Sequence, residues 1–173
     1  ARSLSKGVIG INIMFAAKKF AEMVNTAIDE GIDLVVAGAG FSRDIFALGK
    51  ASGTPVVPIV SSVKLAKISQ RLGAAAIVVE GKEAGGHLGT DQSIKEIIPD
   101  IVAAVDIPVI AAGGILHGQD IADLINMGVS GVQMGSRFAA SVEANSAPAL
   151  KNFYLKAKPE DVVVIHSPVG LPG

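Results

Sequence analysis

Six short, continuous apolar runs, rich in Val, Ile and Ala, recur along this chain of 173 residues. A run in which consecutive side chains are all apolar predicts a strand buried on both faces, as in a parallel sheet covered by helices. The runs start about 20 to 30 residues apart, which is the length of one strand–helix unit. We therefore expect strands at residues 8–13, 34–37, 56–60, 76–80, 108–112 and 131–134.

Amphipathic segments between these runs predict the covering helices. Apolar residues at i, i+3 and i+4 form one stripe on a helix, and a glycine commonly ends such a helix. This pattern precedes a glycine three times, at residues 20–28, 65–72 and 121–125. A fourth helix is expected at residues 99–105, because Pro99 suits a first helical position. A fifth segment, residues 143–157, is interrupted near Pro148, and the place of residues 162–165 in the sheet is left open.

This repeated plan predicts one α/β domain over residues 1–173, and two folds fit it. A TIM-type (β/α)8 barrel has eight strands and typically about 250 residues, so six runs are two strands short of it. An open doubly wound sheet is the alternative. The chain begins without Met at Ala1 and ends in the turn-like Leu171-Pro172-Gly173, so we expect a fragment of a longer protein.

The composition argues against several classes of function. The formal charge is -1 and no basic stripe is interleaved with aromatic residues, which argues against a nucleic-acid partner. The chain has no Cys, which excludes disulfides, thiolate nucleophiles and Cys-ligated metals. No apolar run approaches the roughly 20 residues of a membrane span, and the first residues do not build a signal peptide. We therefore expect a globular, cytoplasmic protein with a small-molecule partner.

Glycines follow the last two runs, at the carboxyl ends of the expected strands. Gly113-Gly114 leads from one run towards a helix, and Gly135-Ser136 follows the next. Glycine lets backbone N–H groups approach an anion closely, and phosphate sites of barrels commonly lie after strands seven and eight. Each pair alone is equally well explained by a tight turn. Together they predict a phosphate site, without the spacing of a dinucleotide fingerprint.

A glycine-rich loop, residues 80–89, carries one imidazole and two carboxylates directly after a strand. His87 lies among glycines, and imidazoles ordinarily titrate near neutrality, which suits proton transfer; a solvated loop histidine is the alternative. Glu80 ends the strand and is expected to point inward, whereas Glu83 fits turn hydrogen bonds at least as well as chemistry. His117 and His166 form no metal-binding spacing with His87, so we expect no metal site.

Two amides interrupt the apolar runs, Asn12 in the first and Gln133 in the last. A buried amide without a partner costs about 1 to 3 kcal/mol, so each needs a hydrogen-bonding neighbour. Either the edge of a cofactor or an internal backbone group meets this need.

Four motifs, in this order, resemble the nitronate monooxygenase family, formerly called 2-nitropropane dioxygenases, whose relatives include the FMN-dependent enoyl-acyl-carrier-protein reductase FabK. They are GINIM from Gly10, EAGGH from Glu83, PVIAAGGI from Pro108 and GVQMGSRF from Gly131. The resemblance covers nearly the whole chain, and the motifs are specific as a set. It implies an FMN-binding TIM-type barrel in which the six runs are strands 3 to 8, followed by the start of a C-terminal tail. The first two βα units of the family are absent here.

The resemblance also implies roles for individual residues. His87 matches the active-site histidine of the family, and Ser136 stands where Thr is common. The position of Glu80 is acidic or an amide in relatives. The implied FMN contacts are Asn12, Glu80, Gly85, Gly114, Gln133, Met134, Gly135 and Ser136, and the strand-end argument adds Gly113.

The activity that the resemblance implies is FMN-dependent oxidation of alkyl nitronates or nitroalkanes with molecular oxygen. The tail 167–173, similar to that of long bacterial members, favours it. The alternative is FabK-like, NAD(P)H-dependent reduction of an enoyl thioester on acyl-carrier protein. A phosphosugar isomerase or lyase without flavin, and a fragment that binds nothing and associates through its open edges, are hypotheses of other classes; a homodimer is a candidate assembly.

Overall fold

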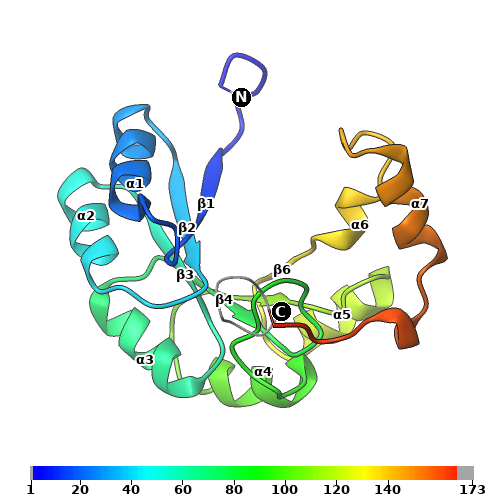
Figure 1. Cartoon of the computed structure of the whole chain (residues 1–173). Coiled ribbons are helices and arrows are strands. Elements are labelled where there is room, and N and C mark those ends of the chain that lie inside the picture. The colour runs from blue at the N-terminus through cyan, green and yellow to red at the C-terminus, as the bar shows by residue number, and fades with distance from the viewer. Residues whose placement is uncertain (1, 167–173) are drawn as a thin grey trace.

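The structure is a computed structural model that describes residues 2–166. Its six strands are all parallel and lie in sequence order, β1-β2-β3-β4-β5-β6. Figure 1 shows the sheet curled into an open half-barrel, with helices α1 to α5 along its outer side. A doubly wound sheet reverses its strand order and carries helices on both faces. That alternative is therefore wrong, and the α/β plan of the TIM-type barrel is confirmed.

All six predicted runs are strands, with ends within two residues of those expected. The strands are β1 (Gly10–Met14), β2 (Leu34–Gly38), β3 (Val56–Val60), β4 (Ile77–Glu80), β5 (Val109–Ala112) and β6 (Gly131–Gln133). The helices are α1 (Phe20–Asp29), α2 (Asp44–Ser52), α3 (Val63–Leu72), α4 (Ile94–Val102), α5 (Gly118–Asn126), α6 (Ser136–Ala139) and α7 (Pro148–Lys156), before a 3-10 turn at Pro159–Asp161. Residues 162–165 form no strand, and the tail 167–173 lies outside the described residues.

The helix expected at residues 99–105 was wrongly placed, because α4 begins at Ile94 and continues through Pro99. The Ser93 backbone N–H donates to the Glu96 carboxylate at 3.0 Å, so the helix starts with a cap well before the proline. A proline inside a helix costs about 3 kcal/mol or more. Four buried isoleucines of α4 offset that cost, since each contributes about 1.5 to 3 kcal/mol on burial.

The sheet has two distinct faces because successive side chains of a strand point to opposite sides. One set of strand residues, including Ile13, Val35 and Val79, belongs to the main core together with the helices. The alternate set forms a smaller apolar cluster contributed by the strands and the residue before β4, with Val57, Val78 and Ala112 buried at its centre. This second face is the concave inner face of the half-barrel. None of the residues named in its cluster comes from a helix.

Ser69 of α3 is a polar exception in the core. Its side chain is 0% exposed, and its Oγ has no hydrogen-bond partner within the described part of the chain. A buried hydroxyl without a partner costs about 1 to 3 kcal/mol, so the alanine variant should be the better core residue.

We expect Ser69→Ala to raise the free energy of unfolding by about 1 kcal/mol, measured by urea denaturation. The matched control is Ser52→Ala, because the Ser52 hydroxyl donates to the Leu48 carbonyl at 3.0 Å and accepts from the Thr54 N–H at 3.2 Å. The control should lose stability. A Ser69→Ala variant less stable than the parent would contradict the assignment of an unpaired hydroxyl.

Candidate functional site at the carboxyl edge of the sheet

The carboxyl ends of the parallel strands meet at one edge of the half-barrel, and two predicted site residues are brought together there. Glu80 of β4 is paired in register with Ala112 of β5, and Ala112 is paired with Gln133 of β6. Since Ala112 belongs to the inner cluster, Glu80 and Gln133 face the concave side from either flank of it. Both side chains are half-buried.

Asn12 lies on the same inner face but at the other end of the sheet. It is paired with Val36, and Val36 with Val57 of the inner cluster. Its side chain is exposed, so the expectation of a buried amide in the first strand was wrong: β1 is an edge strand of an open sheet. Within the described residues, no side-chain hydrogen bond is made by Asn12, Glu80 or Gln133, so all three polar groups can receive a ligand.

Glu80 is the titratable residue among these three, and its carboxyl lies in a partly buried environment. Burial raises the pKa of its carboxyl above the ordinary value, because the strand ends around it are apolar. The folded protein therefore holds the Glu80 proton to a higher pH than the unfolded chain does. Such a group can donate a hydrogen bond when protonated and accept one when ionised.

Glu80→Gln should change the pH dependence of stability. A carboxyl with a raised pKa binds more protons in the folded chain, so the free energy of unfolding falls as pH rises from its ordinary pKa through the raised value. The variant lacks this loss, and we expect its stability relative to the parent to increase as pH rises from about 4 to 8. Urea denaturation across that range checks this, and parallel pH profiles for the two proteins would contradict it.

The loop that carries His87, residues 81–93, is fixed at several points. The Glu83 carboxylate accepts from the Ser93 hydroxyl at 2.7 Å and from the Ile94 N–H at 3.0 Å, which ties the loop to the start of α4. The Ser61 hydroxyl, just after β3, donates to the Gly89 carbonyl at 2.9 Å. His87 is half-buried in the middle of this loop. The loop is therefore held both to the start of its own helix and to the end of the neighbouring strand β3.

Glu83 makes the turn hydrogen bonds that the sequence suggested as an alternative to chemistry. Burial alone would raise the pKa of its carboxyl, but the hydrogen bonds from Ser93 and Ile94 outweigh burial and lower it. A comparable arrangement starts α5, where the Asp120 carboxylate accepts from the backbone N–H groups of Leu116 and His117 at 3.0 and 2.8 Å. These hydrogen bonds lower the pKa of Asp120, and His117 stands at a helix cap.

The glycines after β5 have a packing role in addition to any binding role. Gly113 and Gly114 both have positive φ, at 105° and 67°. A Cβ on Gly113 would lie 2.7 Å from the Ala84 backbone nitrogen, and one on Gly114 would lie 3.0 Å from the Glu83 Cβ. The histidine loop therefore lies directly against this turn, and the tight-turn interpretation describes the backbone found here.

The segment after β6 is more open. A Cβ on Gly135 would meet nothing within 4 Å, and the same holds for Gly85 in the histidine loop. Ser136 begins the short helix α6 and is exposed. Met134 packs its side chain against the main core on the outer face, so only its backbone faces the carboxyl edge.

We expect Gly113→Ala to displace the histidine loop and to destabilise the fold by about 1 to 3 kcal/mol, since it forces both a positive φ on alanine and a contact with Ala84. Gly118→Ala is the control, because a Cβ there meets nothing within 4 Å. Thermal unfolding of both variants tests this, and equal melting temperatures would show that the loop does not depend on the turn.

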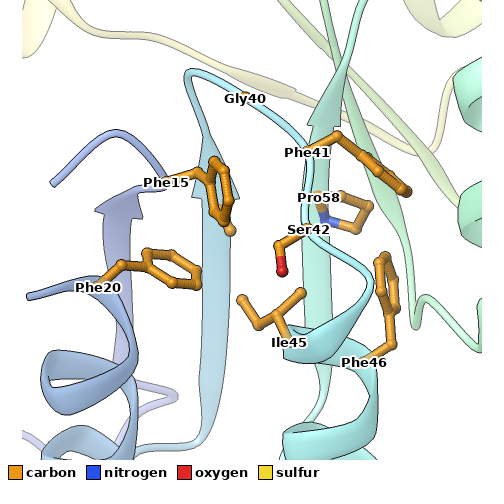
Figure 2. Close-up of a pocket in the computed structure, with 9 residues that line it drawn as sticks. Phe15, Phe20, Gly40, Phe41, Ser42, Ile45, Phe46 and Pro58 are labelled. Carbon is orange, nitrogen blue, oxygen red and sulfur yellow. The ribbon is translucent and has the colours of Figure 1, made fainter. Parts of the chain in front are cut away.

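One feature of this edge is absent from the sequence-based predictions, an apolar pocket between α1 and α2 beside the ends of β1 to β3. Figure 2 shows it, with Phe15 and Phe20 on one side and Phe41 and Phe46 on the other. Four of the six phenylalanines of the chain line it, all within residues 15–46. That clustering was the available signal in the sequence.

Among the described residues there is no cluster of three or more His, Cys, Asp or Glu able to hold a metal ion. Nor does any helix in the described range 2–166 combine the length and apolarity that crossing a membrane requires. The fold and the site together define a class, the parallel β/α barrel-type proteins that carry their functional groups on loops at the carboxyl edge.

Comparison with known proteins identifies the family within that class. The family model described as nitronate monooxygenase matches residues 1–172, and the chain belongs to this family. Its members are flavin-dependent oxidoreductases. The resemblance seen in the four sequence motifs is thereby confirmed.

Three relatives show the range of the similarity. A Rhodococcus jostii protein named (3aS,4S,5R,7aS)-5-hydroxy-7a-methyl-1-oxo-octahydro-1H-indene-4-carboxyl-CoA dehydrogenase is 32% identical over 99% of this chain and 48% of its own length. A probable nitronate monooxygenase of Staphylococcus aureus is 36% identical over 71% of this chain and 37% of its own. The structure of FabK from Thermotoga maritima is 37% identical, with a TM-score of 0.94, over 99% of this chain and 55% of that one. The chain thus spans about half the length of the relatives it matches.

Proposed function

We propose that the protein is an FMN-dependent enzyme that oxidises alkyl nitronates or nitroalkanes with molecular oxygen. The observation that carries the proposal is the placement of Glu80 and Gln133 on either side of Ala112 on the concave face, at the same edge as the start of the His87 loop. Polar groups above an apolar floor, next to a loop that carries an imidazole, are the composition expected of a small-molecule site. Membership of the nitronate monooxygenase family supports the choice of reaction.

The residues of the concave face and of its carboxyl edge fit a flavin in three respects. Side chains of Asn12, Glu80 and Gln133 supply the amide and carboxyl groups that match the polar edge of an isoalloxazine ring. The open backbone at Gly85 and Gly135 leaves room for a bulky ligand. Ser136, Gly113, Gly114 and the Met134 backbone lie at the strand ends where we place the phosphate.

When bound, FMN supplies the electron transfer, and the protein supplies position and proton transfer. We assign His87 as the base that removes the proton beside the nitro group, or that hydrogen-bonds the nitronate oxygen. Hydrogen bonds at Glu83 and Gly89 fix the loop on either side of this histidine. We place the reacting carbon over the apolar inner cluster.

Reduction of an enoyl thioester is the second candidate function, and one observation favours it. The chain matches FabK at 37% identity over 99% of its length, and it matches the Rhodococcus jostii indene-carboxyl-CoA dehydrogenase over the same share. The nitronate monooxygenase of Staphylococcus aureus matches a shorter part, 71%. A histidine at the mouth of the site suits both reactions.

The experiment that separates these functions uses the whole purified protein. Flavin absorbance comes first, because a colourless protein that cannot be reconstituted with FMN would leave a flavin-free phosphosugar enzyme as the better hypothesis. Oxygen uptake with ethyl nitronate is then compared with NAD(P)H consumption on crotonyl thioesters. Uptake of oxygen without activity on the thioester supports the proposed function, and the reverse result supports the second candidate.

Replacing His87 tests its assigned role. We expect His87→Ala to retain FMN but to lose turnover by about 100-fold to 10,000-fold, the usual contribution of a positioned base. Steady-state kinetics and the flavin spectrum measure the two properties separately. The control is His117→Ala at the cap of α5, which should keep its turnover. Unchanged turnover in His87→Ala would remove this residue from the reaction.

A further inference from the structure

The histidine loop, residues 81–93, is closed at its base and rich in glycine around the imidazole. The Lys82 N–H donates to the Gln92 carbonyl at 2.8 Å, which brings the two limbs of the loop together. Gly85 and Gly86 directly precede His87, and a Cβ on either glycine would meet nothing within 4 Å. Glycine loses more backbone freedom on ordering than any other residue. The loop therefore needs fixed points on both limbs if His87 is to keep one position.

The two limbs of the loop are held by different parts of the structure. The limb before His87 is held by the Glu83 carboxylate at the start of α4 and by the turn at Gly113. The limb after His87 is contacted from β3, where the Ser61 hydroxyl donates to the Gly89 carbonyl at 2.9 Å. Gly89 lies two residues from His87. Ser61 therefore supplies a fixed point on the second limb.

The contact between Ser61 and Gly89 is close-packed as well as hydrogen-bonded. A Cβ on Gly89 would lie 2.7 Å from the Ser61 Oγ and 3.2 Å from the Ser61 Cβ, so a side chain there would displace the serine. The register of β3 with β4 pairs Val60 with Val79. Continued by one residue, this register sets Ser61 beside Glu80 at the carboxyl edge. Ser61 thus joins the histidine loop to the strand ends that carry the candidate site.

We propose that Ser61 is a positioning residue for His87: by holding Gly89 it fixes the second limb of the loop, and with it the place of the imidazole. This inference rests on the proposed function, in which His87 removes a proton or hydrogen-bonds the nitronate. Such a group acts only within hydrogen-bonding reach of its target, and a misplacement of about 1 Å costs about 100-fold in rate. Removing one neutral hydrogen bond corresponds to a factor of about three to ten.

The kinetic test uses the FMN-loaded whole protein and the substrate, nitroethane or its nitronate, on which His87→Ala loses turnover. Ser61→Ala should retain FMN and lower kcat/KM about threefold to tenfold. Ser61→Thr keeps the hydroxyl and should restore at least about half of the parent value. Ser62→Ala is the matched control, because the Ser62 hydroxyl accepts the Leu65 N–H at 3.3 Å and caps α3. It should lower the melting temperature but keep kcat/KM. Equal losses of kcat/KM in the two alanine variants would overturn the proposal.

A double-mutant cycle shows whether the effect of Ser61 passes through His87. In a His87→Ala background, Ser61→Ala should lower turnover by less than about twofold, because the imidazole that the serine positions is gone. The same threefold to tenfold loss in both backgrounds would mean that Ser61 acts independently of His87. That result would overturn the positioning role.

A structural measurement separates failure of the positioning role from failure of the proposed function. Nitrogen-15 relaxation of the whole protein gives an order parameter for each backbone amide, about 0.85 where the backbone is rigid and below about 0.6 where it is flexible. Ser61→Ala should lower the values of Leu88 and Gly89, whereas Lys82 should keep the parent value because its hydrogen bond to Gln92 remains. This result without any turnover of nitroalkane or nitronate by the parent would contradict the proposed function and still support Ser61 as the anchor of the loop. Unchanged values at Leu88 and Gly89 would overturn the positioning role, whatever the reaction.

Discussion

The structure depends on the separation of the sheet into two faces, with all helical packing on one of them. Because Ile13, Val35, Val79 and Ala111 are committed to the helix-covered core, the alternate positions are released from core packing. Those alternate positions are where Asn12, Glu80 and Gln133 occur. Polar groups can face the concave side without disturbing the core. Because every strand runs in the same direction, the loop that follows each strand lies at the same, carboxyl edge of the sheet.

Much of the fold could be predicted because its strongest signals are local. Continuous apolar runs gave the six strands, and glycine ends gave three helices. The segment that became α2 carries a weak pattern, since Gly49 sits inside it. That glycine is required by tertiary packing, as a Cβ there would lie 2.7 Å from the Thr54 carbonyl. α4 was misplaced for a related reason: a proline penalty is local, whereas the burial of Ile94, Ile97, Ile98 and Ile101 is set by the whole sheet.

The candidate site was predictable in its composition more than in its geometry. The face on which Glu80 and Gln133 lie follows from the alternation of side chains along a strand. In the structure the two residues flank Ala112, one on each neighbouring strand. The side chain of Met134 packs against the main core, and Gly113 and Gly114 pack against the histidine loop as well as forming a turn. Neither could be predicted, because both depend on tertiary contacts. The phenylalanine pocket was missed because its four rings come from two helices, α1 and α2, and from two separate loops, which only the fold brings together.

The carboxylate of Glu83 joins the histidine loop to the first turn of α4 through Ser93 and Ile94. The shape of the loop is consequently coupled to the first turn of α4, in addition to its contacts with Ser61 and with the turn at Gly113. Fluctuations that fray the start of α4 would release the Glu83 part of the loop while the sheet remains intact. The first turn of α4 thus helps to hold the loop of the candidate site in place.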